Sequence, residues 1–183
     1  HTLGGLLPGM KPESMQHITS ILDVACGPGI WTVELARRQP KISVVGVDTS
    51  ESMIAYARRL SQQQAMGNAA YLTIPSFAEP FPFAEASFDL INMQFIAKFL
   101  KKDDWPHLLS ACWRLLRPGG LLRLTEFEVG QVNSPAHEEL NQLFLHAMHL
   151  ADRCFLLSDR YPDLPDEAEH LCGGTIAFLI ALE

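Results

Sequence analysis

Two stretches of this sequence place glycines and carboxylates where a nucleotide-containing ligand could be held. Asp23 is followed by a turn that carries Gly27 and Gly29. Glycine lets a backbone approach a ligand closely, because a Cβ would block the approach. Asp48 comes roughly twenty residues later, where a carboxylate can accept hydrogen bonds from ribose hydroxyls. These residues predict a site for an adenosine-containing cofactor, with a plain tight turn and a helix cap at Asp48 as the alternatives.

The same turn departs from the pattern of a dinucleotide site. The G-x-G-x-x-G fingerprint places a third glycine at position 32, which is Thr32 here. The carboxylate of Asp23 is a poor neighbour for a pyrophosphate and a good one for an amino group. An NAD-linked oxidoreductase is therefore disfavoured.

Hydrophobic periodicity alternates between strands and helices, which is typical of a mostly parallel sheet with helices on both faces. The apolar runs predict strands at residues 18–25, 41–47, 70–74, 88–94 and 121–127. Helical patterns cover residues 30–38, 50–64, 103–116 and 134–153, whereas residues 175–182 fit either a strand or a helix. We expect a single α/β domain over residues 1–183, a Rossmann-like three-layer sandwich.

Composition limits the partners of this domain. A chain of 183 residues, 48% hydrophobic and 19% charged, can bury one substantial core. The formal net charge of −7 and the scattered Lys and Arg argue against nucleic acid. The four cysteines lack metal-binding spacing, and no apolar run reaches the roughly 18 residues of a membrane span. We expect a soluble cytoplasmic protein with a small-molecule substrate, no metal and no membrane partner.

Four ordered segments resemble the signatures of class I, Rossmann-like S-adenosylmethionine-dependent methyltransferases, in particular the small-molecule group. They are residues 21–29 (ILDVACGPG), 44–53 (VVGVDTSESM), 87–91 (SFDLI) and 115–121 (LLRPGGL). Each segment is common by chance, but the four in this order are a strong signal. The resemblance implies S-adenosyl-L-methionine as cofactor, a cofactor-binding core at about residues 18–127, and a substrate-side part at 128–183.

The resemblance also assigns roles to individual residues. In this family the residue matching Asp23 and the backbone of residues 25–27 hold the methionine amino group, and the residue matching Asp48 holds the ribose. Met53 would pack against the adenine, and the residues after the fourth strand would lie beside the sulfonium. The cofactor-binding residues implied in this way are Asp23, Ala25, Cys26, Gly27, Asp48, Thr49, Met53, Phe77, Ala78, Met93 and Gln94.

Two of these positions depart from the family pattern. Phe77 stands where the family usually has an acidic residue that accepts a hydrogen bond from the adenine amine. The adenine would then depend on stacking and on the backbone near Ala78. Ala25 stands where the family has glycine, a small change.

The acceptor side is less defined by the sequence. Methyl transfer depends mainly on positioning, and a base is required only if the acceptor must lose a proton. His146 and His149, on the helix expected at 134–153, are the weak candidates for such a base, and a solvated helix face is the better interpretation. Phe95 is the aromatic residue best placed to line an apolar acceptor pocket.

The function predicted from these residues is methyl transfer to an oxygen, nitrogen or carbon atom of a small, apolar metabolite. A non-catalytic cofactor-binding or assembly protein on the same fold is the alternative, and Phe77 favours it. Family members usually add an antiparallel strand pair after the long helix, for which the thirty residues after position 153 leave little room. We therefore expect either an incomplete sheet or one that uses residues 175–182 as a partial replacement for the pair. The open edge of an incomplete sheet invites a homodimer.

Overall fold

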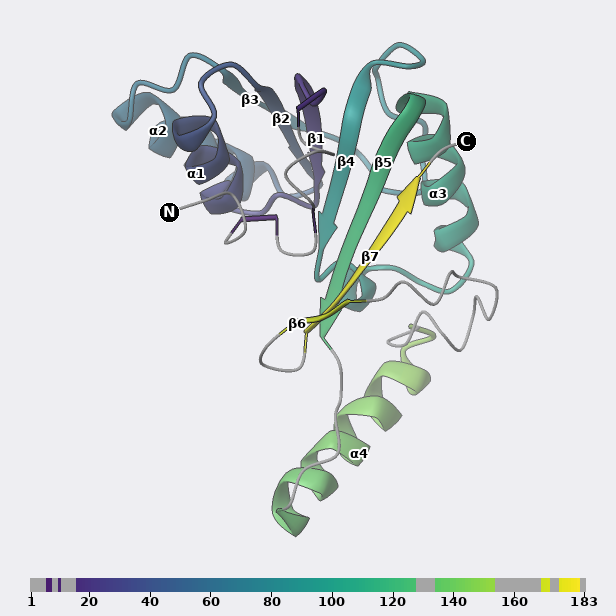
Figure 1. The fold of residues 1–183 in the computed structure, drawn as a ribbon. Helices are drawn as coiled ribbons and strands as arrows, with labels where there is room; N and C mark the ends of the chain where they lie inside the picture. The colour runs from purple at the N-terminus through teal and green to yellow at the C-terminus, as the bar shows by residue number, and fades with distance from the viewer. Residues whose placement is uncertain are drawn as a thin grey trace.

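A twisted, mostly parallel sheet forms the centre of the computed structural model, which describes residues 6–7, 10, 16–127, 134–153, 169–171 and 175–181 (Figure 1). The strand order is β3-β2-β1-β4-β5-β7-β6. Strands β1 to β5 run parallel, whereas β7 pairs antiparallel with β5 and with β6. The strands are β1 (Ser20–Val24), β2 (Ser43–Asp48), β3 (Ala69–Thr73), β4 (Phe88–Gln94), β5 (Leu116–Phe127), β6 (Glu169–Leu171) and β7 (Thr175–Ala181).

Helices cover both faces of this sheet. On one face, α1 buries Leu35 and Ala36 against Ile21 of β1. On the opposite face, α3 packs Trp105 and Leu108 against β4 and β5. The helices are α1 (Ile30–Arg38), α2 (Glu51–Gln63), α3 (Asp104–Leu115) and α4 (Pro135–Leu150), with a short 3-10 helix, η3 (Ala97–Phe99), after β4. The predicted α/β, Rossmann-like three-layer sandwich is confirmed.

The order of the strands fixes where a ligand can bind. The chain runs outward from β1 to β3 and then returns to place β4 on the other side of β1. At such a switch point the connections leave neighbouring strands in opposite directions, and a crevice opens at the carboxyl ends. The turns after β1 and β4 flank this crevice.

The end of the sheet differs from the sequence prediction. Residues 175–182, left open between strand and helix, contribute β7, and β6 joins it, so the expectation that both strands would not fit is wrong. A short edge strand of three residues is enough to complete the pair. Because β7 covers β5, the open edge on which the homodimer was predicted is absent there, and the homodimer itself stays a prediction.

The turn expected between α3 and β5 belongs to β5 itself. Leu116 pairs with Phe88 and Leu121 with Leu90, so four residues of β5 bulge out opposite one residue of β4. Gly119 takes φ +75° in this bulge, a conformation that favours glycine.

This bulge carries Arg117 to a carboxylate at the amino ends of the strands. Asp89 accepts four hydrogen bonds from the backbone and hydroxyl groups of Thr19 and Ser20, at 2.8–3.0 Å. Its other oxygen accepts from Arg117 at 2.7 Å. The segments 87–91 and 115–121, which resemble family signatures, thus tie β1, β4 and β5 together at the end of the sheet away from the crevice.

Helix α4 projects away from the sheet (Figure 1). Much of its apolar side is exposed: Leu143 is 61% and Leu150 is 73% accessible, whereas Met148 is buried. None of the helices in the described part of the chain has the length and apolar content that a bilayer span requires.

Candidate functional site

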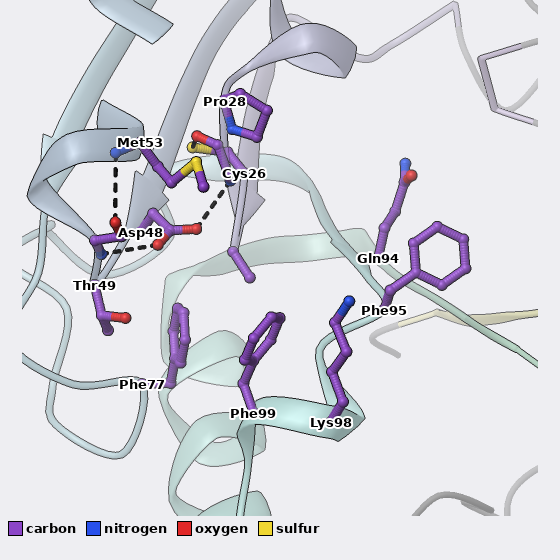
Figure 2. Close-up of a pocket in the computed structure, with 13 residues that line it drawn as sticks. Cys26, Pro28, Asp48, Thr49, Met53, Phe77, Gln94, Phe95, Lys98 and Phe99 are labelled. Atoms are coloured by element: carbon purple, nitrogen blue, oxygen red, sulfur yellow. Dashed lines mark hydrogen bonds between the residues drawn. The ribbon is translucent and has the colours of Figure 1, made fainter. Parts of the chain in front are cut away.

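A cavity of about 450 Å³ occupies the crevice at the carboxyl ends of the strands. This volume lies in the range of small-molecule and cofactor sites. Figure 2 shows that its residues come from the ends of β1, β2 and β4 and the segments that follow them, with Met53 from α2 and Phe77 from the loop after β3. The lining residues are Ala25, Cys26, Gly27, Pro28, Asp48, Thr49, Ser50, Met53, Phe77, Gln94, Phe95, Lys98 and Phe99.

The two glycines of the β1–α1 turn have different tasks. A Cβ on Gly29 would lie 2.7 Å from Ala57 Cβ and 2.8 Å from the Tyr71 ring, so this glycine permits close packing between elements. A Cβ on Gly27 would meet no atom within 4 Å, and Gly27 lines the cavity. Gly27 therefore leaves free the space that a ligand on this turn would fill.

Asp48 joins the two predicted cofactor segments. Its Oδ2 accepts from the backbone N–H of Gly27 at 2.9 Å, and its Oδ1 accepts from that of Ser50 at 2.9 Å (Figure 2). The Ser50 hydroxyl, in turn, caps α2 by accepting from Met53 N–H at 3.4 Å. Ser50 is therefore the N-cap residue of α2, and Asp48 supports this end of the helix through the Ser50 N–H, so a structural role and a ligand-binding role of Asp48 can hold together.

The remaining hydrogen-bond acceptors of Asp48 fit the hydroxyl groups of a ribose. Each carboxylate oxygen can accept two hydrogen bonds and uses one with the protein, so capacity remains for hydroxyl donors. At the adenine side, Met53 and Phe77 provide apolar contact surface. The backbone of Ala78, expected to hydrogen-bond the adenine, does not line the cavity. Its N–H donates to the Ser76 hydroxyl at 3.0 Å instead. The residues present fit S-adenosylmethionine, with stacking as their main contribution to the adenine.

Asp23 lies under the turn, 3% exposed, and does not line the cavity. Its Oδ2 accepts from the Thr32 hydroxyl at 2.6 Å and its Oδ1 accepts from the Asn92 amide at 2.9 Å. The Asn92 oxygen in turn accepts from Arg123 at 2.9 Å. Burial raises the pKa of Asp23 to about 6, and these two hydrogen bonds and the charge of Arg123 oppose the rise.

The wall opposite Asp48 comes from the segment after β4. Phe95 sits at φ +55°, an unfavourable angle for a residue with a Cβ, and its N–H donates to Thr125 at 2.8 Å. The buried carboxylate of Glu126 accepts from Ala97 N–H at 2.9 Å and so holds the start of η3. This helix presents Lys98, whose ammonium lies 4.9 Å from the centre of the Phe99 ring.

Most of the residues predicted for the cofactor come together in this cavity. Asp23, Ala78 and Met93 do not line it, and Met93 is buried in the core below. Sequence reasoning found Gln94 and Phe95 on the β4 side and missed Lys98 and Phe99. Their signal, an aromatic and a cationic residue just after β4, was present in the sequence.

The two histidines proposed for a base lie elsewhere. His146 and His149 are exposed on α4, and neither lines the cavity. The end of α4 does approach the site, because Asp152 C=O accepts from Lys102 N–H at 3.1 Å and Arg153 donates to Lys98 C=O.

The fold and the cavity define a class: Rossmann-like proteins that hold an adenosine-containing cofactor at the ends of β1 and β2. The family described as "Methyltransferase domain" matches residues 21–120, more than half of the chain. The chain belongs to this family of class I methyltransferases, whose cofactor is S-adenosylmethionine.

Individual relatives agree with this assignment. A demethylmenaquinone methyltransferase of Lactococcus lactis subsp. lactis is 30% identical over 126 residues, which are 68% of this chain and 48% of that protein. The enzyme of the same name from Listeria welshimeri is 29% identical over 151 residues, 81% of this chain and 61% of that protein. The chain thus spans between about half and three fifths of these relatives.

A solved structure shows the same fold over almost the whole chain. A SAM-dependent methyltransferase from Methanosarcina mazei aligns with a TM-score of 0.71 at 20% identity, covering 95% of this chain and 99% of that one. At this identity the likeness concerns the fold alone.

Proposed function

We propose that this protein transfers the methyl group of S-adenosylmethionine to an oxygen, nitrogen or carbon atom of a small, apolar metabolite. The observation that carries the proposal is the contact between Asp48 and the N–H of Gly27 at the mouth of the cavity. It joins a ribose-accepting carboxylate to a turn whose glycine leaves room for a ligand. When bound, the cofactor supplies an activated methyl group on a sulfonium.

The chain's own contribution to such a transfer is binding and orientation. Asp48 and the Gly27 turn hold one side of the cavity, and the rings of Phe95 and Phe99 with Lys98 form the other. Aromatic walls exclude water and limit the orientations of a flat acceptor, which is the main requirement of an in-line displacement. No base among these lining residues is needed unless the acceptor must lose a proton.

The relatives suggest which acceptors to test first. Two of them are named demethylmenaquinone methyltransferases. An apolar, ring-containing acceptor of quinone type agrees with the aromatic wall, so we propose this class as the first choice. A non-catalytic role on the same fold is not favoured, because the matching relatives are named as enzymes.

The remaining parts of the proposal concern the setting of the protein. The net charge of −7 supports a small-molecule acceptor over nucleic acid. We also propose that the protein acts in the cytoplasm, where its cysteines stay reduced; Cys26 and Cys112 are free thiols.

The test is calorimetric titration with S-adenosylmethionine and with its demethylated product, S-adenosylhomocysteine. We expect micromolar binding by the intact protein and at least a tenfold loss in Asp48→Asn, since one hydroxyl-accepting oxygen becomes a donor. Asp89→Asn makes the same chemical change at the far end of the sheet and serves as the matched control.

Transfer itself is then measured with a radiolabelled methyl group and a panel of reduced quinones and other apolar acceptors. Label that appears in an acceptor with intact protein and not with Asp48→Asn supports the proposal. Absence of binding by the intact protein would refute it.

A further inference from the structure

Arg123 is a buried cation in the middle of the sheet, 2% exposed, and the site described above does not use it. Its neighbours along β5, Leu122 and Leu124, are apolar and pack under α3. Burial lowers the pKa of Arg123 to about 10, so the environment works against its charge. Its Nε has no hydrogen-bond partner among the described residues. A buried ion pair seldom adds stability over apolar residues of similar size, so stability does not explain this arginine.

The chain of hydrogen bonds from Arg123 has only one consistent direction. A guanidinium can only donate, so the Asn92 side chain must turn its oxygen toward Arg123 and its NH₂ group toward Asp23. The second oxygen of Asp23 accepts from the Thr32 hydroxyl. Both oxygens of Asp23 therefore act as acceptors, as an ionised carboxylate requires.

We propose that Arg123 is a positioning residue for the cofactor site: through Asn92 it keeps Asp23 ionised and fixed beneath the β1–α1 turn, where the negative charge attracts the ammonium group at the methionine end of the cofactor. The inference rests on the proposed function. The register supports it, because Asp23, Asn92 and Arg123 lie side by side on β1, β4 and β5. Residues two positions further along β1 and β4, Ala25 and Gln94, line the cavity.

The other charged and titratable groups near Asp23 do not replace this arginine. Asp48, from β2, acts on Asp23 as a like charge and raises its pKa. Cys26 and Tyr71 also lie near Asp23, and burial keeps the pKa of both groups well above the ordinary values, so both stay neutral. Arg123 is the cation that opposes protonation of Asp23. Without it, the hydrogen bonds from Thr32 and Asn92 alone would oppose burial and Asp48, so the pKa of Asp23 would rise further toward neutral pH.

The experiment compares two ligands over pH 6.0–8.5 by calorimetry. S-Adenosylhomocysteine has the amino group, whereas 5′-methylthioadenosine shares the adenosine and sulfur and lacks the amino-acid part. For Arg123→Met we expect about a tenfold or larger loss of S-adenosylhomocysteine affinity at pH 7, recovering toward pH 8.5 as Asp23 ionises. Binding of 5′-methylthioadenosine should change less than about twofold, because the ammonium interaction is missing.

Two further variants separate this role from a structural one. Arg123→Lys keeps the cation and should restore most of the affinity at pH 7. Arg117→Met removes a cation from the same strand at the far end of the sheet and should lower stability without moving either affinity. If Arg123→Met does not fold, the pH midpoint for S-adenosylhomocysteine binding is measured in Arg123→Gln, which can still donate to Asn92 but carries no charge; an upward shift supports the inference and an unchanged midpoint overturns it.

The outcomes distinguish the two proposals. Equal loss of both ligands at every pH, or wild-type affinity in Arg123→Met, overturns the role of Arg123 and leaves the proposed function standing. Failure of the intact protein to bind either ligand overturns both.

Discussion

Asp89→Asn tests whether the segments 87–91 and 115–121 stabilise the sheet and do not contribute to the cofactor site. The substitution keeps the shape of the side chain and one acceptor oxygen, which can still serve Thr19 and Ser20. Its NH₂ group replaces the oxygen that accepts from Arg117 at 2.7 Å. In the variant the Asn NH₂ group and the Arg117 guanidinium, both donors, then face each other where the wild type has a charge-assisted hydrogen bond.

The magnitude follows from these contacts. A hydrogen bond between charged groups contributes about 1.5–3 kcal/mol, and the bonds that remain lose their charge assistance. Arg117 is 42% exposed and can turn to water, which reduces the loss. We expect the free energy of unfolding to fall by about 2–3 kcal/mol. For a chain of this size that lowers Tm by roughly 5–10 °C.

The assay is urea unfolding as a function of pH, with calorimetric binding of S-adenosylhomocysteine on the same samples. Arg117 and the surrounding donors hold the pKa of Asp89 well below its ordinary value. A lowered pKa contributes stability above about pH 4 that is lost as the pH falls further. The difference between wild type and Asp89→Asn should therefore be full at pH 7 and shrink below about pH 4.

Ligand affinity should not change, because Gln94 lies five positions after Asp89 along β4, about 16 Å at the rise of a strand. A variant with normal stability and weakened binding would refute the reasoning. So would a stability difference that stays constant down to pH 3.

Three further predictions concern the turn and the wall of the cavity. Gly27→Ala should lower S-adenosylhomocysteine affinity more than about tenfold, because its Cβ would occupy space that the ligand fills. It should lower the free energy of unfolding by only about 1 kcal/mol, because that Cβ meets no protein atom at φ +53°. Gly29→Ala should instead lower the free energy of unfolding by about 3–4 kcal/mol, since its Cβ would overlap the Tyr71 ring. Equal effects of the two substitutions in titration and unfolding would contradict this division. Ala25→Gly should raise the free energy of unfolding by about 0.5–1 kcal/mol, since Ala25 holds φ +59°, and a lower urea midpoint would count against it. Burial raises the pKa of Glu126 to about 7, so its contribution to stability is greatest below about pH 4.5 and is lost as the pH rises to 7. The urea midpoint of Glu126→Gln should therefore fall less from pH 5 to 8 than that of the wild type. An equal fall in both proteins would exclude the effect.

Local sequence patterns were sufficient for the order of the elements from β1 to α4 and for one side of the site. Apolar runs bounded by glycine and capping residues determine β1, α1, β2 and α2 largely by themselves. The turn carrying Gly27 and the place of Asp48 at the end of β2 follow from them. Phe95 was found because it directly follows a strand whose end was clear. The left-handed angles at Ala25 and Phe95 could not be foreseen, because neither residue type favours them.

Contacts between distant segments were beyond such patterns. Asn92 and Arg123 reach Asp23 only because three strands pair in one register, and they stand 69 and 100 positions away in the chain. A signal existed, since each is a polar residue between two apolar neighbours: Asn92 stands between Ile91 and Met93, and Arg123 between Leu122 and Leu124. A buried polar group needs a partner, so such a residue predicts a polar neighbour on an adjacent strand without saying which one.

The family signature segments have different roles at the two ends of the parallel sheet. At the carboxyl ends, Gly27 and Asp48 face open space, and the chain tolerates left-handed angles at Ala25 and Phe95 around it. At the amino ends, Asp89 of β4 accepts hydrogen bonds from Thr19, from Ser20 of β1 and from Arg117 of β5. The left-handed angles at Ala25 and Phe95 lower the stability of the fold, and contacts elsewhere must offset this cost. The hydrogen bonds of Asp89 are such contacts. A substitution in the 87–91 or 115–121 segment can therefore abolish activity through unfolding alone, so only ligand affinity measured on folded protein can assign a residue to the site.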